Sequence, residues 1–192
     1  IKAVKAGFRG IDTANQRRHY NEAAVGNAIS KILNNGLKRE EFFIQTKYTY
    51  VHGQDHRIPY NINADYLTQV NQSFQSSLEH LNVDYIDSYI LHGPSVGFGL
   101  TQADLDVWQA MEELYKNKRV LHLGISNVNI EQLKLLLKNV KIKPSFVQNR
   151  CFAEEGWDKE VRNLCKENNI IYQGFSLLTA NQFILPKIKD IA

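Results

Sequence analysis

The chain has 192 residues and 43% of them are hydrophobic, which is enough for one sizeable core and predicts a single domain over residues 1–192. Its 23 basic and 20 acidic residues leave a net charge of +3, too small to indicate a nucleic-acid partner. The longest apolar stretches are only as long as strands, so we expect no membrane partner, and residues 1–10 lack the features of a signal peptide. Cys151 and Cys165 are typical of reduced, buried thiols, which favours a cytoplasmic protein.

Strand-like and helix-like runs alternate along the whole chain. Short apolar, β-branched runs predict strands at residues 10–14, 42–47, 85–91, 120–125, 145–148 and 170–175. Apolar residues at helical spacing predict helices at residues 22–33, 63–81, 104–116, 130–137 and 159–168. A helix end is also expected at residues 2–7, with Gly7 as its C-cap, and a last helix is expected to begin at Pro186.

Two of these helices carry clear cap and face signals. Asn63 and Asp104 are expected to act as N-caps. The apolar residues that we expect on the buried faces are Leu67, Val70, Phe74, Leu78 and Leu81 in the first helix, and Leu105, Trp108, Met111 and Tyr115 in the second.

Six strands separated by helices indicate a parallel sheet made of βαβ units. A doubly wound sheet and a (β/α)8 TIM barrel both fit this alternation, but the dinucleotide-binding glycine pattern of the first is absent. The barrel is therefore the favoured fold. It needs about 250 residues and eight strands, so the first and last strands are expected to lie outside residues 1–192.

Each predicted strand ends on a polar or aromatic residue that can take part in chemistry. These residues are Asp12, Lys47, His92, Ser126 with Asn127, Gln148 and Phe175. Each has an ordinary structural explanation when it is considered alone. In a parallel barrel, however, all of them lie at the carboxyl end of the strands, where barrel active sites are built.

These strand ends resemble the motifs of the aldo-keto reductases, and the resemblance runs nearly end to end. GFRGIDTA at 7–14 with NEAAVG at 21–26 is similar to the first signature of the family, FFIQTK at 42–47 to its catalytic-lysine strand, and DYIDSYILHGP at 84–94 to its histidine strand. GISN at 124–127, FVQNR at 146–150 and QGFSLL at 173–178 resemble the strand ends that hold the nicotinamide.

The resemblance implies an NADP(H)-dependent enzyme with a catalytic tetrad of Asp12, Tyr20, Lys47 and His92. Tyr20 carries a departure, because most relatives place the tyrosine nearer the aspartate, and here two additional residues precede Glu22. The family resemblance also implies that the cofactor contacts Asp12, Ser126, Asn127, Gln148, Phe175 and Ser176. Phe175 stands where many relatives have tyrosine, which preserves a ring for stacking.

The chemistry of these residue types agrees with carbonyl reduction. No side chain supplies a hydride, so a nicotinamide must be bound, and the alkoxide that forms needs an acid. We expect the Lys47 ammonium to lower the pKa of Tyr20 from about 10, and Asp12 to keep Lys47 charged. His92 is expected to donate a hydrogen bond to a small carbonyl substrate.

Two other functions stay open at this level. One is a non-catalytic relative that binds NADP(H) as a sensor or partner subunit. The other is a Schiff-base lyase with Lys47 as nucleophile, which is less favoured because a neighbouring Asp12 raises the lysine pKa. His52 and His56 lie in a loop that lacks the helical context of a zinc site, so no metal is expected. A monomer is favoured.

Overall fold

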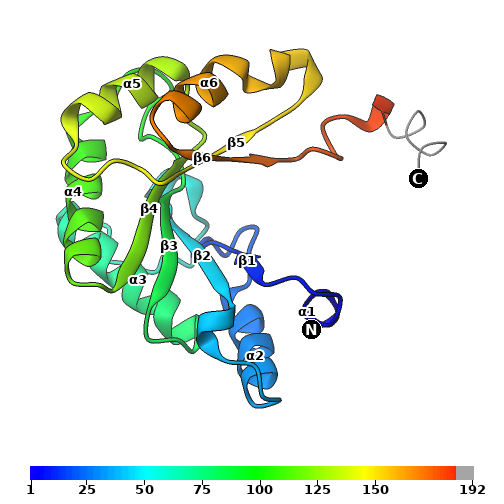
Figure 1. The fold of residues 1–192 in the computed structure, drawn as a ribbon. Coiled ribbons are helices and arrows are strands. Elements are labelled where there is room, and N and C mark those ends of the chain that lie inside the picture. Colours follow the sequence, from blue (N-terminus) through cyan, green and yellow to red (C-terminus); the bar gives the residue numbers. More distant parts are fainter. Residues whose placement is uncertain (185–192) are drawn as a thin grey trace.

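The computed structural model describes residues 1–184, and its centre is a six-stranded parallel sheet (Figure 1). The strands follow one another in sequence order, and each pairs in parallel with its neighbours. Their bounds are β1 Gly10–Asp12, β2 Phe43–Tyr48, β3 Ile86–Leu91, β4 Val120–Ser126, β5 Phe146–Arg150 and β6 Ile171–Phe175. All six predicted strands are therefore present, with ends that differ by a few residues.

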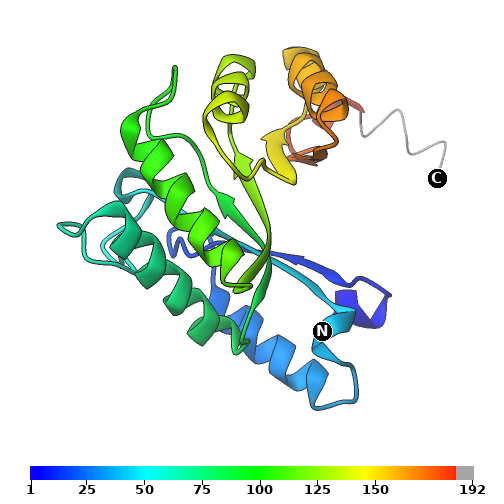
Figure 2. The same cartoon turned by 60° about the vertical axis from the view of Figure 1, so that its left-hand side comes forward.

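Helices connect the strands and cover the outer side of the sheet. They are α1 Lys2–Lys5, α2 Glu22–Leu33, α3 Tyr66–Leu81, α4 Gln102–Lys116, α5 Ile130–Asn139 and α6 Lys159–Glu167, with 3-10 turns η1 Arg39–Glu41, η2 Val51–Gly53, η3 Ala153–Asp158 and η4 Gln182–Ile184. α3 packs between α2 and α4, and Figure 2 shows this row along the convex side of the sheet. None of the helices in residues 1–184 is long and apolar enough to cross a membrane.

The sheet is curled, so side chains from its two ends meet on its concave side. Gln45 in β2 donates from Nε2 to Oε1 of Gln173 in β6, at 2.9 Å. Gln148 in β5 donates from Nε2 to Oδ2 of Asp12 in β1, at 3.1 Å. These bonds join residues more than 120 positions apart. The sheet therefore bends as the wall of a barrel does, rather than lying open as in a doubly wound fold.

Two close approaches, one between helices and one between strands, leave no room for a side chain. A Cβ on Gly26 of α2 would lie 2.0 Å from the backbone oxygen of His80 in α3. A Cβ on Gly124 of β4 would lie 2.3 Å from Cδ1 of Ile90 and 2.8 Å from the backbone oxygen of Phe146. Glycine at these two positions lets α2 lie close to α3 and lets Ile90 of β3 and the backbone of β5 lie close to β4.

Several of the predicted helix ends are wrong by a few residues. α3 is capped by the side chain of Asp65 and not by Asn63, so the helix begins two residues later in the sequence than expected. α4 is capped by Thr101, and Asp104 is the third helical residue of a reciprocal capping box. At α1 the C-cap is Ala6, and Gly7 follows it with a φ of +100°. The helix expected from Pro186 lies outside the described residues.

Two residues that were predicted on buried helix faces are exposed. Leu67 in α3 is 49% exposed and Tyr115 in α4 is 39% exposed, so both predictions are wrong. In α4, Trp108 and Met111 are buried as predicted, and Val107 and Leu114 are buried beside them. Leu67 lies in the first turn of α3 and Tyr115 in the last turn of α4, so the apolar pattern extends beyond the buried part of each helix.

Candidate active site

The strand-end residues do gather at one end of the curled sheet. A pocket of about 450 Å³ at the carboxyl ends of the strands is lined by residues of β1, β4, β5 and β6, by His92 directly after β3, and by the loop after β1. Those singled out by the sequence are Asp12, Tyr20, His92, Ser126, Asn127, Gln148, Phe175 and Ser176. Lys47 lies behind this pocket and is almost completely buried.

An ion pair between Lys47 and Asp12 is the centre of the site. Nζ of Lys47 donates to Oδ1 of Asp12 at 2.7 Å and to the backbone oxygen of Thr13 at 2.8 Å. The lysine side chain is 1% exposed, whereas the aspartate side chain is 43% exposed. The carboxylate is therefore anchored from behind by the buried cation, while its outer side faces the pocket.

Burial shifts the pKa of Lys47 in the direction opposite to the one expected from the ion pair alone. The pKa of Lys47 is lowered because burial penalises the charged form more than the charge of Asp12 and its hydrogen bond favour it. The expectation considered only the ion pair, which by itself raises the pKa. Nζ of Lys47 is held by Asp12 and Thr13 and its side chain is only 1% exposed, so a substrate cannot reach the amine as a Schiff-base lyase requires.

Tyr20 lies in the pocket despite its altered spacing in the sequence. Its ring centroid is 5.4 Å from Nζ of Lys47 and 5.9 Å from the ring of His92, which it meets edge-on. The pKa of Tyr20 is raised by burial and by the negative charge of Asp12. The predicted lowering of the Tyr20 pKa is therefore wrong, because burial and then the charge of Asp12 both favour the neutral phenol. Tyr20 keeps its proton near neutral pH.

His92 follows β3 and is held on both sides. Its backbone N–H donates to the backbone oxygen of Tyr48 at 2.9 Å, and its backbone oxygen accepts from Nδ2 of Asn127 at 2.8 Å. Nδ1 of its ring lies 2.7 Å from Oγ1 of Thr49. Burial, and then the charge of Lys47, lower the pKa of His92 to about 4, so the imidazole is neutral at physiological pH.

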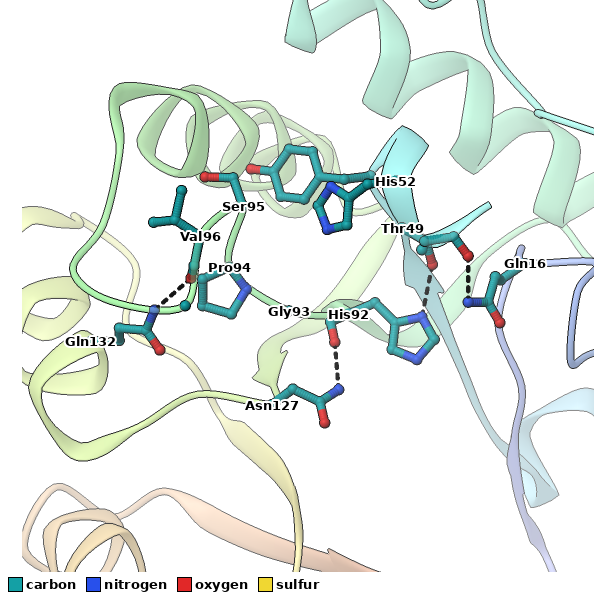
Figure 3. Close-up of a pocket in the computed structure, with 13 residues that line it drawn as sticks. Gln16, Thr49, His52, His92, Gly93, Pro94, Ser95, Val96, Asn127 and Gln132 are labelled. Carbon is teal, nitrogen blue, oxygen red and sulfur yellow. Dashed lines mark hydrogen bonds between the residues drawn. The ribbon is translucent and has the colours of Figure 1, made fainter. Parts of the chain in front are cut away.

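A second pocket of about 410 Å³ adjoins the first and shares Gln16, His92 and Asn127 with it (Figure 3). Most of its wall comes from the loop after β2 with η2 and from the segment after β3. His52 lines this pocket, whereas Tyr60 of the same loop is buried. His92 therefore stands between two connected spaces.

The residues expected to hold a nicotinamide fit that group. The hydroxyl of Ser126 is committed to the backbone oxygen of Gln148 at 2.6 Å, which fixes the ends of β4 and β5 together. The side-chain amide of Asn127 donates to His92 and Ser126, so its oxygen remains an acceptor with no partner among residues 1–184. Phe175 supplies a ring face at the end of β6. An acceptor and an aromatic face are what a carboxamide-bearing ring requires.

Sequence reasoning missed several polar groups on the inner side of the sheet. Gln45 donates to Oδ1 of Asp12 at 2.8 Å, Gln173 accepts from Gln45 and Gln148, and Thr49 contacts His92. The signal was available, because side chains two positions apart in a strand point the same way. Gln45 and Thr49 lie two residues before and two residues after Lys47. The alternation pattern therefore placed them on the lysine's side of the sheet.

With this geometry in place, the chain belongs to the aldo/keto reductase family, whose family model matches residues 1–189. Its curled parallel sheet is part of the (β/α)8 barrel of that family, so the predicted fold class is confirmed.

Curated relatives and solved structures agree with this assignment. The glyoxal reductase of Bacillus subtilis is 34% identical over 182 residues, which cover 95% of this chain and 58% of the relative. A solved aldo/keto reductase from Brucella melitensis has a TM-score of 0.77 at 27% identity and covers 99% of this chain and 66% of that one. An aldo-keto reductase of Bombyx mori, solved in complex with NADP, has a TM-score of 0.70 at 28% identity and covers 91% and 53%. The chain thus spans only about six-tenths of the length of the first curated relatives that it matches.

Proposed function

We propose that the protein containing this chain reduces an aldehyde or ketone to an alcohol, with NADPH as the hydride donor. The observation that carries the proposal is the buried Asp12–Lys47 ion pair, with Tyr20 and His92 beside it in one pocket. The family membership supports an oxidoreductase. The NADP complex of the Bombyx mori relative supports the choice of cofactor.

The cofactor supplies the hydride, and the residues of this chain orient the nicotinamide and move the proton. The side-chain oxygen of Asn127 would accept from the carboxamide of the nicotinamide, and Phe175 would supply the ring face for stacking. Gln148 and Ser126 tie β5 to β4 and β1, which keeps these two contacts at a fixed separation. Asp12 and Ser176 line the same pocket and complete the contact set.

Tyr20 is the acid that protonates the developing alkoxide. A phenol remains a stronger acid than an alcohol even when its pKa is raised, so transfer from Tyr20 to an alkoxide is downhill. The raised pKa also ensures that the proton is present when the substrate arrives. Lys47 lies 5.4 Å from the Tyr20 ring and supplies positive charge as a phenolate forms, while Asp12 keeps that cation in place.

His92 orients the substrate carbonyl at the junction of the two pockets. Because it is neutral at physiological pH, it acts as a hydrogen-bond donor and not as a cation. A neutral donor fixes the direction of the carbonyl without competing with Tyr20 as proton source. The substrate itself occupies the second pocket, which His52 and Asn127 also line.

The experiment is NADPH oxidation by the complete protein with 4-nitrobenzaldehyde, followed by absorbance. Tyr20→Phe is expected to lower kcat by about 10²–10⁴-fold, because it removes only the acidic hydroxyl. Tyr115→Phe is the matched control, since that tyrosine is exposed on α4, and it should turn over like the wild type. Full activity of Tyr20→Phe would exclude Tyr20 as the acid. Tight NADPH binding without any turnover by the wild type would favour the non-catalytic alternative.

We also infer that residues 1–192 belong to one domain of a monomer that acts in the cytoplasm. Cys151 and Cys165 are both free and buried, which supports a reducing compartment. Sedimentation of the complete protein is expected to give the mass of a single chain, and a dimer mass would contradict the inference.

A further inference from the structure

Thr49 lies beside His92, on the side of the ring that faces away from the proposed substrate contact. It follows the last residue of β2, two positions after Lys47, and its side chain points to the same inner side. Oγ1 of Thr49 lies 2.7 Å from Nδ1 of His92, and this contact is drawn in Figure 3. The backbone bond from His92 to Tyr48 keeps the two side chains in this register.

The surroundings of Thr49 restrict what its hydroxyl can do. The residue is 6% exposed. Its backbone oxygen already accepts from Oη of Tyr60 at 2.7 Å and from Nε2 of Gln54 at 3.2 Å, which anchors the loop. Within residues 1–184, Nδ1 of His92 is the hydrogen-bond partner of the hydroxyl. Because a buried hydroxyl that cannot donate is unfavourable, the direction of this one bond matters.

Only one direction satisfies both groups. A neutral imidazole carries one proton, on either Nδ1 or Nε2. If Nδ1 donates to Thr49, the threonine proton has no acceptor among the described residues, and Nε2 is left as an acceptor facing a carbonyl that also only accepts. If Thr49 donates to Nδ1, the hydroxyl is satisfied and Nε2 carries the proton.

We propose that Thr49 is a positioning residue whose hydroxyl donates to Nδ1 of His92 and so holds the ring proton on Nε2, the nitrogen that can donate to a substrate carbonyl. The inference deepens the proposed carbonyl reduction and rests on it for its catalytic meaning. The assignment of the tautomer itself rests only on the hydrogen bonds around Thr49 and His92.

The charges around His92 make its protonation a second measure of this bond. Burial and Lys47 lower its pKa to about 4, with a smaller lowering from His19, while Asp12 raises it, and the uncharged Tyr20 ring meets it edge-on. A hydrogen bond donated to Nδ1 stabilises the neutral ring, because a protonated ring cannot accept there. Removing the donor is therefore expected to raise the pKa of His92.

The test is ¹⁵N NMR of the histidine rings in the complete protein, with Thr49→Val, which keeps the shape but removes the donor, and Thr49→Ser, which restores it. The wild type and Thr49→Ser should show a protonated Nε2 and an unprotonated Nδ1 for His92. Thr49→Val should show a larger fraction of the other tautomer and a higher pKa. Its kcat/KM should fall about tenfold, the loss expected for one hydrogen bond, and Thr49→Ser should recover it.

Tyr60→Phe is the matched control, since it removes a buried hydrogen bond to the backbone of Thr49 and leaves the threonine hydroxyl in place. It should leave the His92 tautomer unchanged. The same tautomer shift in Tyr60→Phe would mean that general disturbance of the loop is responsible, which overturns the proposal. So would a wild-type His92 with its proton on Nδ1. The NMR measurement needs no turnover, so an inactive wild type with a protonated Nε2 would reject the proposed reaction and leave the role of Thr49 in setting the tautomer intact.

Discussion

Removing the negative charge of Asp12 tests how much that charge stabilises the buried ammonium of Lys47. In Asp12→Asn the ammonium of Lys47 loses the negative charge at 2.7 Å and keeps only neutral acceptors, the amide oxygen and the backbone oxygen of Thr13 at 2.8 Å. Breaking a buried pair by deleting one partner costs about 3–5 kcal/mol when both groups are buried. The Asp12 side chain is 43% exposed, so solvent already screens part of the interaction, and we expect about 2 kcal/mol.

The size of this loss is measurable by thermal unfolding of the complete protein. For a domain of this size, about 2 kcal/mol lowers Tm by about 4–8 °C. The pH dependence should change as well, because the native pKa of Lys47 is lowered while the unfolded value is 10.5. Between these two pKa values the unfolded chain binds more protons, so stability rises with pH in that window. Asp12→Asn removes the interactions that raise the native pKa, so the rise should begin at a lower pH.

A double variant separates the ion pair from other effects of the substitution. Asp12→Asn combined with Lys47→Met removes both charges and should be less destabilised than Asp12→Asn alone, because no uncompensated cation remains. Glu131→Gln breaks an exposed pair with Lys134 and serves as the control, with no measurable change in Tm expected. The reasoning would be refuted if Asp12→Asn had the Tm of the wild type. It would also be refuted if the double variant were less stable than Asp12→Asn, because Asp12 would then not stabilise the charge of Lys47.

Three further predictions address packing, pH and the cofactor. Gly26→Ala should destabilise the protein by about 1–3 kcal/mol, seen as an earlier urea midpoint, because its Cβ would meet the backbone oxygen of His80 at 2.0 Å; an unchanged midpoint would mean that α2 and α3 separate freely. The pH profile of kcat/KM should show no limb near the ordinary histidine value of about 6.5, because His92 is neutral above about 4; a limb that disappears in His92→Gln would contradict this. Phe175→Ala should weaken NADPH binding in a fluorescence titration, whereas Phe175→Tyr should preserve it; equal affinities of the two variants would argue against ring stacking.

Much of the fold is already determined by local sequence patterns. Strand periodicity, helix periodicity and the βαβ alternation are properties of short segments, so all six strands and α2 to α6 could be predicted before any tertiary contact was known. Helix ends were harder. Asp65 and Thr101 compete with Asn63 and Asp104 for the cap positions, and several residue types with similar cap preferences lie within a few positions of each other.

The same patterns determined which residues could act in a site, since parallel strands bring their carboxyl ends to one face. The placement of Asp12, Lys47 and His92 near one pocket follows from that rule alone. Tyr20 was different, because the loop that carries it has no periodicity, and its position beside the ring of His92 could be obtained only by closing the loop over the sheet.

Tertiary structure alone decided the electrostatics. The sequence places an acid and a lysine on neighbouring strands, but the net direction of each pKa depends on how much water burial removes. Lys47 is so deeply buried that desolvation outweighs Asp12 and lowers its pKa. The pKa of Tyr20 is raised by burial and then by the charge of Asp12, which was expected only to keep Lys47 charged. The contact between Thr49 and His92 was also decided by the tertiary structure. The two residues directly follow β2 and β3, so the register of these strands brings their side chains together.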